Sequence, residues 1–204
     1  VSIPTGTDME IFTPSTHPTL ERKGFHVGMV SVLRRDKGHR YFLEAIPMIL
    51  KEIPGAAFSI AGDGPQLRNI EEQIRELSLE GKVSLLGHRE DVPGIMASLD
   101  VLVHPSSGHE GLAQSILQAL AMERPVVATD IGAISEVVID NISGLLIQPC
   151  SAEQIAEKVL EIYRNPELGR QMGKEGKRLV AAKHSADHML NEIEALYRKL
   201  QKTP

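Results

Sequence analysis

The sequence predicts an α/β fold, a Rossmann-like, doubly wound parallel sheet of about six strands followed by C-terminal helices. Short aliphatic runs alternate with amphipathic helical segments from about residue 24 to residue 150. This alternation is typical of a parallel sheet with helices on both faces. The 204 residues include no Trp, three Tyr and four Phe. The core must therefore be aliphatic, as it is in buried parallel strands.

The elements follow one another along the chain with little ambiguity. Helix 40–52 has an apolar face at helical spacing, but Pro47 within it is expected to cause a kink. Ser151, with Glu153 and Gln154, has the chemistry of a helix cap. Strands are expected at Val27–Leu33, Ala56–Ala61, Lys82–Leu86, Asp100–His104, Pro125–Thr129 and Gly144–Ile147. Helices are expected at 40–52, 65–79, 91–98, 110–122 and 132–139, then from 151, at 166–182 and at 187–202.

Composition excludes several classes of protein. The net charge of −5 gives no reason to expect nucleic acid as a partner. The single cysteine, Cys150, cannot form an intrachain disulfide, which fits a cytoplasmic protein. No apolar run reaches the length that spans a bilayer, and no signal peptide opens the chain.

The first two loops that follow strands carry groups suited to phosphate. Ligands of doubly wound sheets bind beyond the carboxyl ends of the strands. Arg34, Arg35 and Lys37 precede a glycine and a helix start, which favours phosphate binding, although a solvated glycine turn remains an alternative. Gly62 and Gly64 would let the backbone approach a ligand closely, but a plain tight turn is about equally compatible with them.

The next two loops offer groups for a base, a sugar and a diphosphate. The loop containing His88 and Arg89 is a candidate for holding a base or a sugar edge, unless Asp91 merely caps the next helix. Glu110 has no basic neighbour in sequence, so its carboxylate is predicted to be free for sugar hydroxyls, or else only to favour the helix dipole. The amides of Gly111 and Leu112, at the predicted helix start, would suit a diphosphate. Gln118, two turns further, would reach a ribose or is simply an exposed polar residue.

Other chemistries are disfavoured. Ser106 and His109 lack the G-x-S-x-G turn of a hydrolase, and Cys150 has no helper group. The eight histidines show no metal-ligand spacing, so no metal is predicted.

Taken in order, these segments resemble the C-terminal domain of group 1 (family 4) retaining glycosyltransferases, which have the GT-B fold. The similarity covers nearly the whole chain. It lies in IPTGTD at 3–8, DKG at 36–38, AGDGP at 61–65, LGH at 86–88, PSSGHEG at 105–111, QALA at 118–121, RPVVAT at 124–129, SEVV at 135–138 and SGLL at 143–146. Each piece is weak, but the ordered set is specific.

The resemblance implies one half of a GT-B enzyme that transfers a sugar from a nucleotide diphosphate donor, UDP or GDP, without a metal or other cofactor. By this analogy Glu110 contacts the transferred sugar. Lys37 and the amides of Gly111 and Leu112 hold the diphosphate, and position 118 holds the ribose. Residues 1–23 would connect to an absent N-terminal acceptor domain, residues 24–183 would bind the nucleotide sugar, and residues 184–204 would form a helix returning to that domain. Relatives often sit at the cytoplasmic face of the membrane, so peripheral membrane association of the full-length enzyme is expected.

Three positions depart from the family pattern. Gln118 replaces the usual Glu, Val32 the usual Arg, and Ala113 the usual Gly. A neutral amide is a weaker acceptor for ribose hydroxyls than a carboxylate. A degenerate or non-catalytic nucleotide-binding module therefore stays as the alternative. A dinucleotide-dependent dehydrogenase is disfavoured because G-x-G-x-x-G is missing, and a nucleotide-sugar epimerase would share the donor site.

Overall fold

The strands form one parallel sheet, as predicted, and their order in it is β3-β2-β1-β4-β5-β6. The computed structural model describes residues 3–21, 24–108 and 110–201. The strands are β1 (His26–Val30), β2 (Ala57–Ala61), β3 (Val83–Gly87), β4 (Val101–His104), β5 (Val126–Thr129) and β6 (Leu145–Ile147). The chain starts in the middle of the sheet, winds outward to β3, and returns to β4 on the other side of β1. This is the doubly wound topology.

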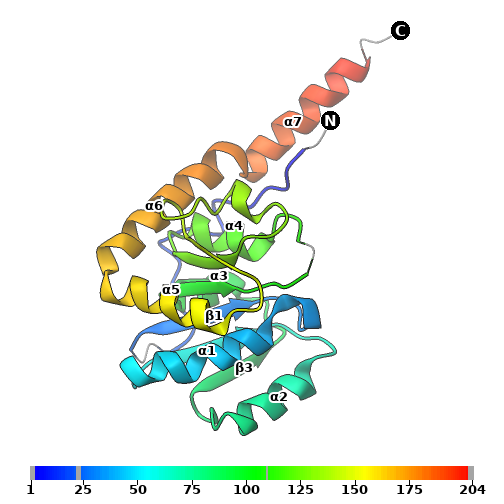
Figure 1. Ribbon diagram of the computed structural model, residues 1–204. Coiled ribbons are helices and arrows are strands. Elements are labelled where there is room, and N and C mark those ends of the chain that lie inside the picture. Colours follow the sequence, from blue (N-terminus) through cyan, green and yellow to red (C-terminus); the bar gives the residue numbers. More distant parts are fainter. Residues whose placement is uncertain (1–2, 22–23, 109, 202–204) are drawn as a thin grey trace.

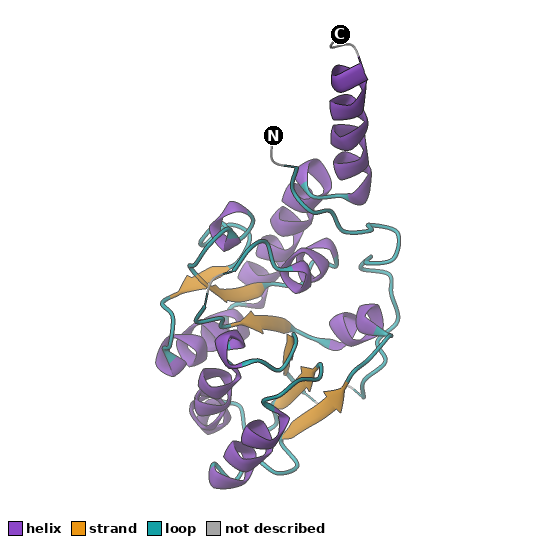
Figure 2. Ribbon diagram, turned by 90° about the vertical axis from the view of Figure 1, so that its right-hand side faces the viewer, coloured by secondary structure: helices purple, strands orange, loops and turns teal. Residues whose placement is uncertain are grey.

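Helices cover both faces of the sheet (Figure 1; Figure 2). One face packs against α1 (His39–Glu52), α2 (Leu67–Glu76) and α5 (Ala152–Arg164), and the other against α3 (Val92–Ser98) and α4 (Gln114–Ala121). The helix α6 (Pro166–Lys183) packs on α4, and α7 (Ala186–Gln201) follows it. Two short 3-10 turns, η1 (Arg35–Lys37) and η2 (Ile134–Glu136), lie after β1 and β5.

The core is aliphatic and lies in two layers, one on each face of the sheet. In β4, Val101 and Val103 belong to the layer under α1 and α5, whereas Leu102 belongs to the layer under α4. All three are buried. Successive side chains of a strand point to opposite faces, so a strand covered on both faces must be apolar throughout. This confirms the predicted aliphatic core.

The predicted helix 110–122 is wrong at its start, because α4 begins at Gln114. The carbonyl oxygen of Glu110 accepts a hydrogen bond from the amide of Ala133 at 3.4 Å, and Ala113 is extended with φ −70° and ψ 121°. Residues 110–113 are thus held as a loop against the segment after β5. Gly111 and Leu112 precede the helix, and Gln118 lies about one turn into it.

Two smaller differences concern the end of β1 and the segment predicted as helix 132–139. β1 ends at Val30 rather than residue 33, and the segment predicted as helix 132–139 contains only η2. Pro47 lies inside α1, which continues to Glu52. The predicted cap at Ser151 is confirmed, since its Oγ accepts from the amide of Gln154 at 3.2 Å.

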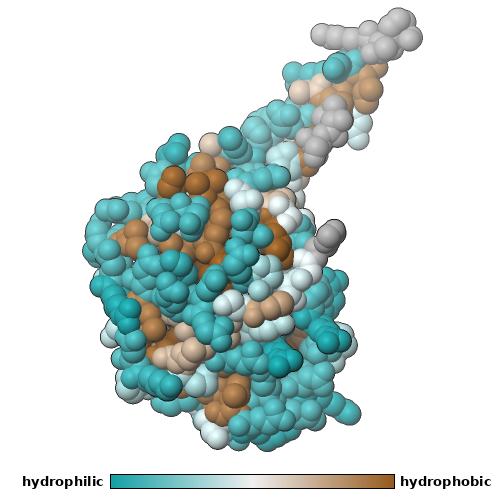
Figure 3. All heavy atoms as spheres, in the orientation of Figure 1, coloured by the Kyte–Doolittle hydropathy of each residue, from teal (hydrophilic) through white to brown (hydrophobic). Residues whose placement is uncertain are grey.

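The N-terminal segment crosses the chain where α6 gives way to α7. The amide of Thr7 donates to the carbonyl of His184 at 2.8 Å, and that of Ala186 donates to the carbonyl of Thr7 at 2.9 Å. From there α7 extends away from the body of the molecule and exposes Leu190, Tyr197 and Leu200 (Figure 1; Figure 3). The boundaries 1–23, 24–183 and 184–204 stay predictions. None of the helices in the described residues is both long and apolar enough to cross a membrane.

Gly38 gives the first testable prediction. It has φ +75°, and a Cβ at this position would lie 1.8 Å from the carbonyl oxygen of Pro105, in the loop after β4. Gly38→Ala is therefore expected to cost about 3 kcal/mol, from left-handed strain and a backbone clash together. Urea denaturation measures this loss.

Gly81→Ala is the matched control. Gly81 also has φ +75°, but nothing lies within 4 Å of its hypothetical Cβ, so the cost is about 1 kcal/mol. Equal losses of unfolding free energy in the two variants would show that the loops after β1 and β4 are not in tight contact at Gly38.

Candidate functional site

The sheet has its topological switch point between β1 and β4, where the chain direction across the sheet reverses. Ligands of doubly wound sheets bind in the crevice outside the strand ends at this point. The loops that follow β1 and β4 meet there. The amide of Ser107 donates to the carbonyl oxygen of Asp36 at 2.8 Å, and Gly38 lies against Pro105. The groups predicted from two separate loops are thereby brought to one place.

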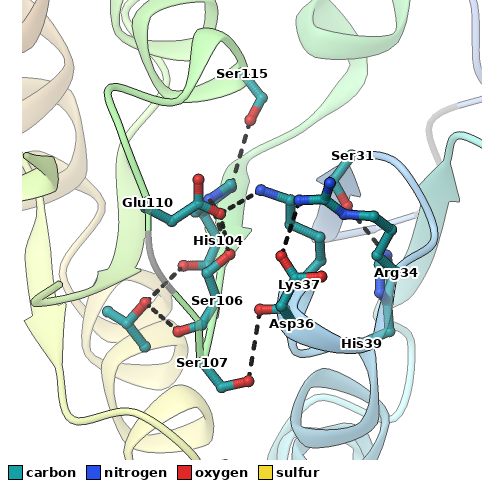
Figure 4. Close-up of polar contacts among 11 residues, drawn as sticks. Ser31, Arg34, Asp36, Lys37, His39, His104, Ser106, Ser107, Glu110 and Ser115 are labelled. Atoms are coloured by element: carbon teal, nitrogen blue, oxygen red, sulfur yellow. Dashed lines mark hydrogen bonds and ion pairs between the residues drawn. The ribbon is translucent and has the colours of Figure 1, made fainter. Parts of the chain in front are cut away.

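Lys37 and Glu110 form an ion pair across this junction (Figure 4). Their side chains are 12% and 8% exposed, so solvent screens the pair little. Glu110 Oε1 also accepts a hydrogen bond from the Ser106 hydroxyl, and Nε2 of His104 lies 3.3 Å away. Nδ1 of His104 lies 3.4 Å from the hydroxyl of Ser115, at the start of α4. One carboxylate oxygen is thus held by three side chains.

These contacts control the ionisation of Glu110. Burial alone would raise the pKa of its carboxyl group, but the hydrogen bonds from His104, Lys37 and Ser106 outweigh burial and hold the pKa at about 2. Glu110 is therefore a carboxylate at neutral pH. The expectation that it has no basic partner was wrong, because Lys37 is 73 residues away in sequence and adjacent in space.

A hollow of about 440 Å³ lies beside this cluster, and its size falls within the usual range for small-molecule sites. It is an open hollow, lined by the loops after β1, β2 and β3 and by the start of α4. Gly62 is required here, because at φ +139° its Cβ would lie 1.9 Å from the carbonyl oxygen of Ser31. The lining residues are Val30, Ser31, Val32, Ala61, Gly62, Asp63, His88, Arg89, Val92, Gln114, Ser115 and Gln118. We call this space the donor hollow, after the nucleotide-sugar donor that the family resemblance in the sequence leads us to expect.

Several predicted site residues come together in the donor hollow, and others do not. Gly62, His88, Arg89 and Gln118 all line it. Gly64, which has φ +154°, does not line this hollow, and its backbone lies against that of Leu33. The residues Arg34 and Arg35 line a different hollow, and Gly111 and Leu112 lie in the loop before α4.

Arg89 and Asp91 form a pair at the rim. The guanidinium donates two hydrogen bonds to the carboxylate, at 2.6 and 2.5 Å, and this pairing holds the pKa of Asp91 down at about 2. The Asp91 side chain does not cap α3, contrary to the simpler reading of this loop. Arg89 therefore enters the hollow with its charge already balanced.

The part of the chain that the structure describes holds no cluster of three or more His, Cys, Asp or Glu able to bind a metal ion. Independence from metal stays a prediction.

Comparison with known proteins identifies the family. The family model described as "Glycosyl transferases group 1" matches residues 17–179. The chain belongs to the group 1 glycosyltransferases. The alpha-D-kanosaminyltransferase of Streptomyces kanamyceticus is 28% identical over 177 residues, which cover 86% of this chain and 45% of that enzyme.

Two further similarities bear on this group 1 glycosyltransferase. A UDP-Gal:alpha-D-GlcNAc-diphosphoundecaprenol alpha-1,3-galactosyltransferase from Escherichia coli is 32% identical over 157 residues, covering 72% of this chain and 40% of that enzyme. The crystal structure of Anabaena Alr3699/HepE in complex with UDP and glucose superimposes with a TM-score of 0.87, at 23% identity, over 95% of this chain and 55% of that one. The chain thus spans about half the length of the relatives it matches, as expected for one domain of a GT-B enzyme.

Sequence reasoning missed several polar residues of this candidate site. His104 is 4% exposed at the last position of β4, and a polar residue ending a buried aliphatic strand was the available signal. Gln114 and Ser115 line the donor hollow at the start of α4. They were missed because the helix was expected to begin at Glu110, which placed position 114 a full turn inside it.

His39, at the start of α1, gives a prediction on pH. Burial lowers the pKa of its imidazole to about 4, and Nε2 lies 3.1 Å from the Ser31 hydroxyl. The folded protein keeps His39 neutral while the unfolded chain takes up a proton near pH 6.5. Stability is thus full above pH 6.5 and falls by up to about 3 kcal/mol as pH drops to 4.

His39→Gln is expected to flatten this loss of stability, measured by urea denaturation at a series of pH values. The exposed His17→Gln serves as control and should leave the profile unchanged. A profile that keeps its slope in His39→Gln would rule out His39 as the source.

Proposed function

We propose that this chain is the donor-binding domain of a retaining hexosyltransferase that uses a UDP-sugar. The observation that carries the proposal is the buried Lys37–Glu110 pair at the switch point, beside a hollow lined by Gly62 and Gln118. Lys37 and Glu110 place a cation and a carboxylate side by side, and these two groups suit the two parts of a sugar diphosphate. The cation faces the phosphates and the carboxylate faces the sugar hydroxyls.

Each group then has a distinct task. Lys37 neutralises the diphosphate as it becomes the leaving group. Glu110, ionised by its neighbours, accepts hydrogen bonds from the transferred sugar. Gln118 bonds the ribose, and the loop of His88 and Arg89 holds the base. The amides of Gly111 and Leu112 remain candidates for the diphosphate. Because side-chain cations and amide dipoles supply the positive charge, the transfer needs no metal.

The choice of UDP rests on the relatives. The Escherichia coli relative is named for UDP-Gal, and the Anabaena structure contains UDP. The acceptor would bind to a second domain, since the chain spans only about half of each relative, and catalysis needs reacting groups positioned from both sides. Without such a domain the chain would bind the donor and transfer nothing. A location at the cytoplasmic face of the membrane stays a prediction.

Calorimetric titration of the chain with UDP, GDP, ADP and NAD in the presence of EDTA tests the proposal. We expect UDP to bind with the highest affinity and NAD not to bind. Preference for GDP or ADP would change the base but keep the donor site, whereas binding of NAD alone would overturn the proposal. Binding that disappears with EDTA would contradict metal independence.

The second candidate is a nucleotide-binding module that does not catalyse transfer. It is favoured by Gln118, a neutral amide that makes no side-chain hydrogen bond with any described residue, and by Val32, which is 44% exposed in the donor hollow. Ala113 has an extended backbone that any residue can adopt, so its methyl group is the only way in which it would disturb a bound phosphate. If UDP fails to bind, the variant Val32→Arg with Gln118→Glu separates the two candidates. Recovery of binding indicates a degenerate site.

A further inference from the structure

A second hollow, of about 350 Å³, lies on the outer side of the β1–α1 loop, between the first turn of α1 and α2. It shares no lining residue with the donor hollow. Its surface is hydrophilic, as the region where α1 and α2 begin shows in Figure 3. The lining residues are Arg34, Arg35, His39, Arg40, Gln66, Asn69, Ile70 and Gln73. They include three guanidinium groups and no carboxylate, so the hollow favours an anion.

The arginines differ in how far their charge is already balanced. Arg34 pairs with Asp36 at 2.9 Å, and Arg40 pairs with Glu44 at 2.8 Å. Arg35 is exposed and forms no hydrogen bond or ion pair with any residue that the structure describes. Arg35 and Lys37 are the first and last residues of the three-residue turn η1, and Lys37 pairs with Glu110. One uncompensated guanidinium thus faces the second hollow.

Backbone dipoles add to this charge. α1 begins with His39 and Arg40, and α2 begins with Leu67 after Gln66, so the first turns of both helices border the hollow. Neither helix has a side-chain cap. The first amides of a helix have no partner within it and carry partial positive charge. The side-chain amide of Gln73 lies at the same place, donating to the carbonyl oxygen of Arg40 at 3.1 Å.

We propose that this second hollow binds a phosphate group, carried by a small soluble molecule or by a lipid headgroup. A phosphate accepts hydrogen bonds on several oxygens at once, which matches guanidinium groups and helix amides arriving from two elements. A carboxylate has fewer acceptor positions for the same donors. The site is separate from the donor hollow and does not depend on UDP binding there.

Titration of the chain with inorganic phosphate, followed by amide chemical shifts, tests the proposal. The double variant Arg35→Gln/Arg40→Gln is expected to bind phosphate at least about tenfold more weakly. The matched control is Arg170→Gln/Arg178→Gln on α6, where both arginines are exposed and paired with a glutamate three residues earlier. This control should bind phosphate as the original chain does.

A second arm separates the hollow from the donor site. Lys37→Met should leave phosphate binding at the second hollow within about twofold, because Lys37 does not line it. Phosphate binding that is lost in Lys37→Met and kept in the Arg35/Arg40 variant would belong to the donor site and would overturn the proposal. Since this arm uses no nucleotide, its failure is distinct from a failure of UDP to bind.

A third arm distinguishes the two sources of phosphate. Phosphatidylcholine vesicles with and without phosphatidic acid are sedimented with the chain and with both double variants. Binding to phosphatidic acid that the Arg35/Arg40 variant loses indicates a lipid headgroup. Binding of free phosphate without vesicle binding indicates a soluble ligand. Absence of both, or equal binding by the variant and its control, overturns the proposal.

Discussion

Replacing Glu110 by Gln in the complete enzyme is expected to lower sugar transfer by about a hundredfold to a thousandfold. Affinity for UDP is expected to stay within about threefold, because UDP lacks the transferred sugar that Glu110 would contact. Glutamine has nearly the same shape as glutamate but carries no charge. The substitution therefore removes the charge-assisted hydrogen bonds to the sugar and releases Lys37 from its pair. Transfer rates at saturating donor and calorimetry with UDP measure the two effects.

A control substitution of the same chemistry is available on the surface. Glu175→Gln changes an exposed carboxylate on α6 and should leave both quantities unchanged. Equal losses of transfer and UDP affinity in Glu110→Gln would contradict a sugar contact. They would indicate instead that Glu110 only holds the loop after β4 in place.

The sequence was sufficient for the fold because the aliphatic runs, the amphipathic helical segments and the composition all indicate the same architecture. Aliphatic runs such as Val101–His104 alternate with amphipathic helices, and a parallel sheet with helices on both sides buries both faces of such strands. The rule that ligands bind beyond the strand ends directed attention to the loops after β2 and β3, which line one hollow in the structure. Gly62, His88 and Gln118 lie around one hollow for that reason.

The sequence was insufficient wherever a contact joins distant loops. The Lys37–Glu110 pair spans 73 residues, and no local pattern reports which side chains face each other across a switch point. The start of α4 was missed because its position is set by the hydrogen bond from Ala133 to Glu110 and not by a capping residue. Glu110, Leu112 and Ala113 are compatible with a helix, and tertiary contacts override their helix propensity.

Lys37→Met is the complementary substitution, and it is expected to have the opposite signature. Methionine keeps most of the aliphatic length but removes the charge that faces the diphosphate. UDP affinity should fall by about tenfold or more. The pKa of Glu110 should rise, because one of the three groups that stabilise its carboxylate is lost while burial remains. Calorimetry with UDP and a pH titration of the Glu110 carboxyl carbon by NMR measure the two effects.

Lys174→Met on α6 is the control for loss of a surface lysine, and both quantities should be unchanged in it. The double variant Lys37→Met/Glu110→Gln then distinguishes direct from indirect action. If Lys37 binds the diphosphate itself, UDP affinity stays low in the double variant. If Lys37 acts only by holding Glu110, then adding Lys37→Met to Glu110→Gln causes no further loss of transfer. The UDP affinity of the double variant is then close to that of Glu110→Gln alone. We expect the first outcome, because in the proposed site Lys37 binds the diphosphate of the donor and Glu110 binds the transferred sugar.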